Sequence, residues 1–452
     1  MAAAVLGAGW QAGAQSAKQE DPIPANPSQA IGAIERSFTS LKTPEPLMLF
    51  PQMKEQLRDT PAFIRDSKAG FNFRSYYRDE LTNVQNGGSS TWKEAWAAGG
   101  SFNFETGRLW NLISGGLVLY TSFPVYAPLD HDGTGLLKAG QQQYGVLGQL
   151  YGKVHLNEQN TIVAGRYLYD TPFIGPHDNR MTPKTFYGYT LMGSYGDSEG
   201  SGPFFRYGGG YIAAIKERNS TEFISMSRAA GASEDRGVGL LGGLMRWGPV
   251  HIGAIEYYAQ DTMNIFYAEG RAGHDFGDTS VMLQGQFAAQ NSVGMNLLNG
   301  GNYWATNQFG TQLQIGYSTA ILTAAYSVVN PGFNVQTPWS ANPFYTDAQI
   351  LAFNRAGENA IMVGASYVMA PIGLPGVAAS VFYFNGWTGA PAAGGPLVES
   401  EWDFNLEWRP NWKPLQGLWL RARYGKSWTT QNGTTTVVDE VRLILNYGIK
   451  LY

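Results

Sequence analysis

The chain has 452 residues, of which only 15% are charged and 13% are aromatic, and it contains no cysteine. The lack of cysteine excludes disulfides, thiolate metal sites and cysteine nucleophiles, and a net charge of -4 without a basic run argues against nucleic acid as a partner. A mean hydropathy of -0.22, without any stretch near the ~20 apolar residues of a spanning helix, excludes a helical membrane protein but suits a transmembrane β-barrel.

The chain opens with a segment that we interpret as a signal peptide, residues 1–17. Its apolar part is "AAAVLGAG" at 2–9, and "AGA" at 12–14 offers small residues for cleavage. The basic residues that usually precede such a segment are missing, so an Ala-rich tail is the alternative. Residues 18–69 are predicted to be a periplasmic segment, with one short helix at 51–64.

From residue 70 to the end at 452, the sequence alternates with a period of two, as β-strands do. In "GLWLRARYGKSW", Arg421 and Arg423 share one face while Leu418 and Leu420 occupy the other. Roughly eighteen such runs can be marked; they start near residues 70, 95, 109, 143, 160, 184, 205, 236, 250, 264, 279, 307, 320, 358, 376, 399, 417 and 438. The chain is therefore predicted to be all-β, an antiparallel up-and-down transmembrane β-barrel.

The connections between these runs alternate between long and short. The long ones include 79–94, 122–142, 218–235 and 329–357, and the short ones include 107–108, 157–160, 248–249 and 371–376. This rhythm, with an even strand number, is typical of barrels in the outer membrane of Gram-negative bacteria. If the first strand rises from the periplasm, the tight turns and both termini are periplasmic. Soluble β-sandwich domains would predict no such alternation.

Four segments carry a resemblance to a known family. They are "GFNFRSYYRDE" (70–80), "GRYLYDTPFIGPHDNRMTPKTFYGYTL" (165–191), "PFFRYGGGYIAAIKERNSTEFISMSRAAG" (203–231) and "GLWLRARYGKSW" with "DEVRLILNY" (417–447). The sequence resembles the OprD family of outer-membrane porins from about residue 48 to its end. The resemblance implies an eighteen-stranded barrel, with its pore within one chain, that passes small carboxylates, including amino acids and aromatic acids.

The resemblance further implies a row of lumen-facing basic residues that guides carboxylates. The matching residues are Arg74, Arg78, Arg421, Arg423 and Arg442. Because barrel closure brings the first strand beside the last, these five fall on three adjacent strands. A row of guanidinium groups attracts anions and binds a carboxylate through two donors. The alternative is plain solvation of a lumen wall, with pairing to Glu407, Asp403 or Asp439.

By resemblance and by position, the loop 170–184 folds into the barrel and narrows it. Its candidates for the constriction are Asp170, Asp178, Asn179 and Arg180, although Asp178 and Asn179 could equally serve hydrogen bonds within the turn. Loop 289–308 contains no acidic residue and adds the candidates Asn291 and Tyr303. Such a neutral, aromatic wall favours uncharged or aromatic carboxylates over cationic amino acids.

Two other functions remain open. A barrel hydrolase would need a cluster such as "LDHDG" at 129–133, but adjacent loop residues seldom converge on one point, and no HExxH, GxSxG, Walker or CxxC motif occurs. An adhesive or plugged barrel could bind partners through loop 329–357; the alternative role of this loop is to cover the mouth of the barrel. The expected partners of a porin are small anionic or zwitterionic solutes, outer-membrane lipid, the barrel-assembly machinery and, as an open question, two further copies in a homotrimer. No enzyme activity, cofactor or metal is expected.

Overall fold

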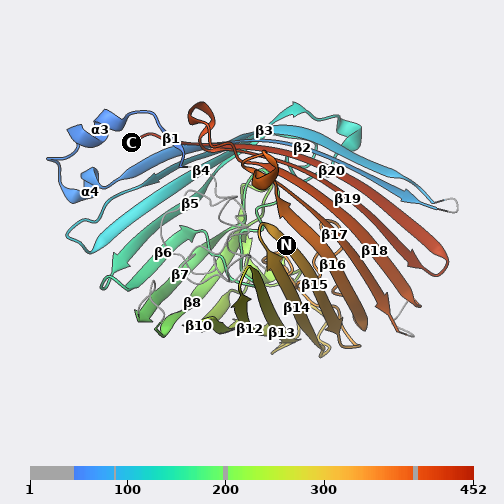
Figure 1. Cartoon of the computed structure of the whole chain (residues 1–452). Coiled ribbons are helices and arrows are strands. Elements are labelled where there is room, and N and C mark those ends of the chain that lie inside the picture. Colours follow the sequence, from blue (N-terminus) through green and yellow to red (C-terminus); the bar gives the residue numbers. More distant parts are fainter. Residues whose placement is uncertain (1–44, 86–87, 197–201, 390–394) are drawn as a thin grey trace.

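The structure is a computed structural model that describes residues 45–85, 88–196, 202–389 and 395–452. Twenty strands form one sheet, and eighteen of them close into an antiparallel barrel because β2 pairs with β20 (Figure 1). The barrel strands are β2 (Lys68–Val84), β3 (Thr91–Glu105), β4 (Ile113–Tyr126), β5 (Tyr144–His155), β6 (Asn160–Tyr167), β7 (Thr185–Gly196), β8 (Phe204–Lys216), β10 (Val238–Trp247), β11 (Val250–Ala259), β12 (Met263–Phe276), β13 (Thr279–Asn291), β14 (Ala305–Tyr317), β15 (Ala320–Val329), β16 (Glu358–Val368), β17 (Val377–Thr388), β18 (Leu397–Trp408), β19 (Leu418–Gln431) and β20 (Thr434–Lys450). The predicted signal peptide lies outside the described residues.

The remaining elements are short and lie in the connections. They are β1 (Leu47–Met48), β9 (Phe223–Ser225), α3 (Pro51–Gln56), α4 (Ala62–Arg65), α5 (Met226–Ala229) and the 3-10 turns η3 (Leu129–His131), η4 (Ala370–Ile372) and η5 (Lys413–Leu415). The single helix predicted at 51–64 is two separate helices, because Pro61 disfavours a helical conformation in the residue before it. Within the described ranges, every helix is too short or too polar to cross a membrane.

The predicted barrel is confirmed, and every predicted strand start lies within four residues of an observed one. The predicted faces also hold in β19, where Arg421 and Arg423 are buried inside the barrel and Leu420 points outward. The prediction of a long loop at 79–94 was wrong, because most of these residues lie in the strands β2 and β3. Glu80 continues the inward alternation there, and only residues 85–90 connect β2 to β3.

The alternation makes a testable prediction about the lipid-facing surface. Leu313 in the middle of β14 is 39% exposed on the outside, whereas its neighbour Gln314 faces the lumen and is 5% exposed. We expect Leu313→Arg to destabilise the folded barrel by roughly 2–4 kcal/mol, the cost of arginine near the bilayer midplane. Urea unfolding in lipid vesicles measures this cost. Gln314→Arg, one residue away, should cost clearly less, and equal costs would contradict the assigned faces.

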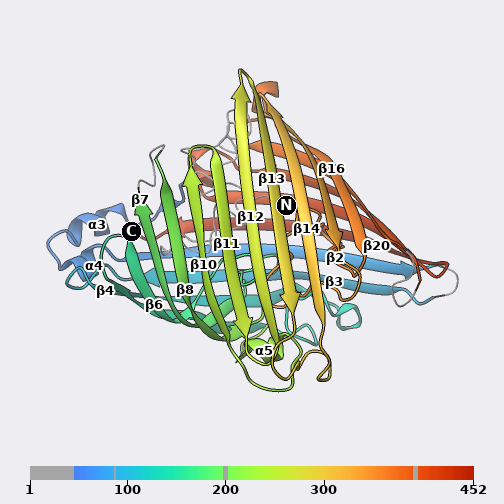
Figure 2. The same cartoon turned by 90° about the horizontal axis from the view of Figure 1, so that it is seen from below.

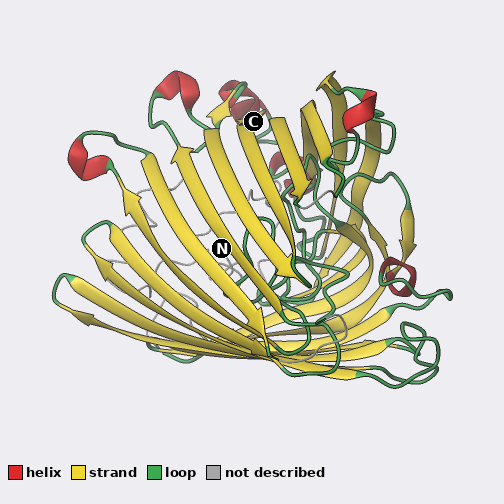
Figure 3. Ribbon diagram, turned by 90° about the vertical axis from the view of Figure 1, so that its right-hand side faces the viewer, coloured by secondary structure: helices red, strands yellow, loops and turns green. Residues whose placement is uncertain are grey.

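We call the end of the barrel that holds the start of β2 and the end of β20 the turn end, and the opposite end the loop end. Four loop-end connections carry much of the irregular chain: the β4–β5 loop (127–143), the β6–β7 loop (168–184), the β8–β10 loop (217–237) and the β15–β16 loop (330–357). Figure 3 shows this irregular chain gathered within the ring of strands. The predicted inward fold of the β6–β7 loop is confirmed by its residues Phe173 and Ile174, which are fully buried against side chains of the barrel strands.

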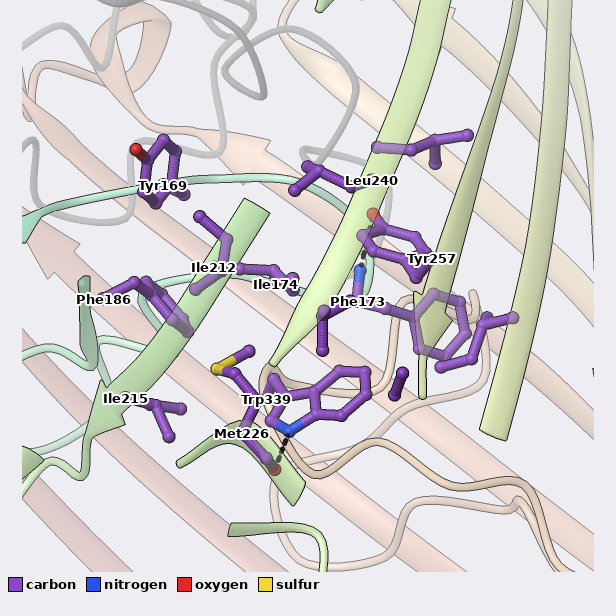
Figure 4. Close-up of a cluster of buried hydrophobic side chains, with 14 of the residues drawn as sticks. Tyr169, Phe173, Ile174, Phe186, Ile212, Ile215, Met226, Leu240, Tyr257 and Trp339 are labelled. Atoms are coloured by element: carbon purple, nitrogen blue, oxygen red, sulfur yellow. Dashed lines mark hydrogen bonds between the residues drawn. The ribbon is translucent and has the colours of Figure 1, made fainter. Parts of the chain in front are cut away.

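A buried apolar cluster holds two of these loops against the inner wall of β8, β10 and β11 (Figure 4). Phe173 of the β6–β7 loop and Trp339 of the β15–β16 loop are both fully buried. The Phe173 amide donates to the Tyr257 hydroxyl at 3.2 Å, and the Trp339 indole donates to the Met226 carbonyl at 2.7 Å. Burial of large aromatic side chains together with satisfied polar groups fixes both loops inside the barrel.

Candidate functional site

The five predicted arginines lie together on one inner wall. Arg74 and Arg78 are on β2, Arg442 is on β20, and Arg421 and Arg423 are on β19. β20 lies between the other two strands, and its Arg442 is the direct register partner of both Arg78 and Arg423. Three guanidinium side chains thus form a row perpendicular to the strands, as barrel closure predicts.

Carboxylates neutralise part of this row. Glu440 accepts from Arg78 Nε at 3.1 Å and also pairs with Arg442. On the neighbouring strand pair, Arg421 Nε lies 2.9 Å from Glu407 Oε1. The alternative of pairing to Glu407 is therefore partly right. Glu440 was missed, although its position two residues before Arg442 places it on the same face.

The tip of the β6–β7 loop crosses the lumen to this wall. Asp178 accepts two hydrogen bonds from Arg74, at 2.6 and 2.8 Å. Arg74 also donates to the Arg180 carbonyl at 2.5 Å, and the Tyr76 hydroxyl donates to the Asn179 carbonyl at 3.2 Å. Three of the four loop candidates from the sequence therefore meet the arginine wall.

Two further loops end on the same wall. Arg78 Nη1 donates to the Thr134 carbonyl of the β4–β5 loop at 2.6 Å, and Arg442 Nη2 donates to the Gln349 carbonyl of the β15–β16 loop at 2.9 Å. Thus three arginines each hold the backbone of a different inserted loop. No periodic signal in the sequence marks Thr134 or Gln349, because loop residues follow no repeat.

Between the β6–β7 loop tip and the wall lies a small hollow that is open to the surrounding lumen. It is lined by Arg74, Tyr76, Asp178, Asn179, Trp419, Arg421, Arg423 and Ile444. Trp419 was missed from the sequence, although it shares the inward face of Arg421 by strand alternation. Its ring lies 5.4 Å from the Arg421 guanidinium carbon, and its indole donates to Glu407 at 3.2 Å.

The other predicted constriction residues lie elsewhere. Asp170 is near the other end of the β6–β7 loop, beside Gly175, and does not line the hollow. Asn291 ends β13 in the outward register of Phe287, and Tyr303 is 69% exposed in the connection 292–304. Neither residue lines the hollow, and their role in a constriction stays a prediction.

The hollow has a strongly basic surrounding. Burial lowers the pKa of His177 well below its usual value, and the nearby charges of Arg218 and Lys184 lower it further. The imidazole is therefore neutral at pH 7, and its Nε2 lies 2.9 Å from the Asn179 amide nitrogen. Arg218 in turn donates to the Asn179 side-chain oxygen. The loop tip is held by cations on both sides.

In the "LDHDG" segment, His131 packs against neighbouring side chains. His131 stacks on Trp92 with ring centroids 3.9 Å apart and lies 3.5 Å from Glu94. In the part of the chain that the structure describes, no three histidine or carboxylate side chains gather where they could hold a metal ion. His131 is therefore held in place by its contacts with Trp92 and Glu94.

Comparison with known proteins places the chain. Residues 61–451 match the family model "outer membrane porin, OprD family". OccK9 (OpdG) of Pseudomonas aeruginosa has a similar structure, with 23% identity, a TM-score of 0.76 and coverage of 86% of this chain and all of that one. The structure of OpdK of P. aeruginosa with vanillate is also similar, with 20% identity and a TM-score of 0.74. A BenF-like porin of Pseudomonas fluorescens Pf-5 has 18% identity and a TM-score of 0.73. Each match covers 86% of this chain and all of the other. A search of curated protein sequences finds no match. Because the family model spans most of the sequence and the barrel matches these porins, the chain belongs to the OprD family of outer-membrane porins.

Proposed function

We propose that the small solutes taken up by this outer-membrane porin carry a carboxylate group, and that the arginine row guides them to the hollow. The observation that carries the proposal is the hollow's lining, which brings three guanidinium groups together with one carboxylate, that of Asp178. In a narrow pore the field of such a wall is less screened than on an open surface. A solute carboxylate entering the hollow therefore meets a net positive wall.

The same lining supports aromatic acids as one class of solute. Trp419 and Tyr76 present aromatic surface beside Arg421 and Arg423. An aromatic ring of the solute could pack on Trp419 while its carboxylate reaches a guanidinium fork. That OpdK was crystallised with vanillate, an aromatic acid, is consistent with this choice.

The inserted loops favour a channel over an adhesive barrel. Trp339 and Phe344 of the β15–β16 loop are fully buried inside the barrel, so the apolar side chains that could have bound a partner are already packed. In the orientation we propose, the turn end faces the periplasm and solutes enter from the loop end. We further expect the barrel-assembly machinery to insert the chain, and a trimer to be the oligomeric form to look for.

The experiment is a reversal-potential measurement on the purified protein in a planar bilayer under a salt gradient, with chloride and then benzoate as the anion. We expect anion preference and a current altered by benzoate, because the hollow carries excess positive charge. Cation preference would reject the arginine row as the selectivity element. No conductance at all would favour the plugged or adhesive barrel.

A further inference from the structure

A second basic row crosses the inner wall of β10, β11 and β12. Arg246 is the register partner of His251, and His251 is the register partner of Arg271. The row continues without a break through Gln284 on β13 and Gln312 on β14. Five adjacent strands thus carry polar side chains capable of donating hydrogen bonds at one level, perpendicular to the strands.

Strand alternation directs these side chains into the lumen. The flanking residues Trp247 and Ile252 are 67% and 54% exposed on the outside, so Arg246 and His251 between them point inward. Gln284 and Gln312 are each 2% exposed, and the amide of the first donates to the second at 2.8 Å. The row is therefore part of the inner wall.

This second row is as far from the first as the barrel allows. β11 is nine strands away from β20 in either direction around the eighteen-stranded barrel. Figures 1 and 2 show β10 and β12 across the lumen from β2 and β20. The second row also lies close to the turn end, because only residues 248 and 249 separate β10 from β11. The second row therefore borders the mouth of the pore at the turn end.

The side chains around the row differ from those around the first. Arg271 Nη2 lies 3.2 Å from His251 Nδ1, and the Arg246 guanidinium carbon lies 5.2 Å from the Phe204 ring. Arg206 on β8 is the register partner of Leu244, two residues from Arg246 on the same face. Three arginines therefore share this part of the wall.

Two carboxylates on the same face of β12 already accept hydroxyl hydrogen bonds. Glu269 accepts from the Tyr267 hydroxyl at 3.0 Å, and Asp275, nearer the turn end, accepts from Ser280 at 2.6 Å. Glu269 lies at the register level of Arg206 and is two residues from Arg271 on the same face, but among the described residues neither arginine forms a direct ion pair with it or with another carboxylate. In the first row, by contrast, carboxylates pair with most of the arginines. On this part of the wall, Arg206 and Arg271 thus present guanidinium groups to the lumen without a direct ion pair to a described carboxylate, and Glu269 is the carboxylate nearest to them in register.

We propose that Arg206, His251 and Arg271 form a second anion site at the turn end, which binds the carboxylate of a solute after it leaves the hollow. The proposal rests on the proposed function, because it takes the same class of solute. Guanidinium forks bind carboxylates through two parallel hydrogen bonds, and the glutamine amides beside them supply further donors. Because the two sites lie on opposite walls, the solute crosses the lumen between them.

The test is block of the single-channel chloride current by benzoate added to one side of a planar bilayer. Since the sequence has no cysteine, Lys413→Cys in the exposed connection between β18 and β19 gives the orientation through a charged thiol reagent. Arg206→Gln and Arg271→Gln should each raise the half-blocking concentration from the turn-end side by about tenfold, the order of one lost charge-assisted hydrogen bond. Block from the loop-end side should change little.

Arg108→Gln is the matched control, because it removes an arginine at the turn end that pairs with Glu158 away from the row. Benzoate should block this variant at the same half-blocking concentration as the unaltered protein. If benzoate added from the turn-end side also blocks Arg206→Gln and Arg271→Gln at the half-blocking concentration of the unaltered protein, the second site does not exist. Arg206→Gln keeps the test decisive should Arg271→Gln fail to fold. Absence of carboxylate block in the unaltered protein from both sides, with cation preference, would instead overturn the proposed function.

Discussion

Arg423→Glu is expected to replace the anion preference that we propose with cation preference and to lower benzoate flux at least about tenfold. Arg423 lines the hollow and is the register partner of Arg442 in the first row. The substitution changes the local charge by two units at the hollow that we propose solutes pass. Reversal potentials in a planar bilayer, and benzoate uptake into vesicles, measure the two effects.

Arg423→Gln separates charge from shape. It removes the positive charge but keeps hydrogen-bonding capacity, so its selectivity should fall between those of the unaltered protein and Arg423→Glu. Arg228→Gln is the matched control for a lost arginine outside the hollow, since Arg228 forms an exposed pair with Asp235 on the β8–β10 loop. Anion preference retained in a folded Arg423→Glu barrel would contradict the guiding role of the row.

Glu440→Gln is expected to destabilise the barrel by roughly 3–5 kcal/mol, the usual cost of breaking a buried ion pair. Glu440 is 1% exposed and pairs with both Arg78 and Arg442, which are register partners on adjacent strands. Without the carboxylate, two buried guanidinium groups face one another with less compensation. Urea unfolding in lipid vesicles measures the loss.

The same substitution should loosen the loops that narrow the pore. Arg78 and Arg442, held by Glu440, donate to the carbonyls of Thr134 and Gln349 in two inserted loops. We expect a higher single-channel conductance with larger fluctuations, because these loops lose their fixed contacts with the wall.

A double variant and a surface control test this explanation. Adding Arg442→Gln to Glu440→Gln should recover part of the stability, since Arg78 keeps Glu80 as a partner and the second unpaired charge is gone. Glu234→Gln, in an exposed pair with Arg236, should change neither stability nor conductance. A Glu440→Gln protein with unchanged stability and conductance would show that the pair does not hold the loops.

The barrel, and the faces and adjacent strands of the arginines in the first row, could be predicted because they depend on local patterns, whereas the row's guiding role came from the family resemblance. Alternation in a strand such as β19 places Arg421 and Arg423 on one face whatever the rest of the chain does. Closure of an up-and-down barrel then joins the first strand to the last, so Arg74 and Arg442 become neighbours through topology alone. These inferences require only the period of the sequence and the order of the strands.

The constriction could be predicted only in part. Asp178, Asn179 and Arg180 were found because their segment resembles a family motif, whereas Asn291 and Tyr303 were chosen by loop composition and do not line the hollow. Composition describes a loop's polarity but contains no information about the wall that it packs against.

By itself, the sequence determined which residues face lipid and which face the lumen, and that one arginine row spans the closing strands. Only the tertiary structure decided which loops enter the barrel, that Gln349 and Thr134 meet the arginines, and that a second row containing His251 stands on the opposite wall. The reason is that the side of the barrel wall to which a side chain points follows from the period of two along a single strand. Loop positions and rows across strands depend instead on pairing register and packing between residues far apart in the chain.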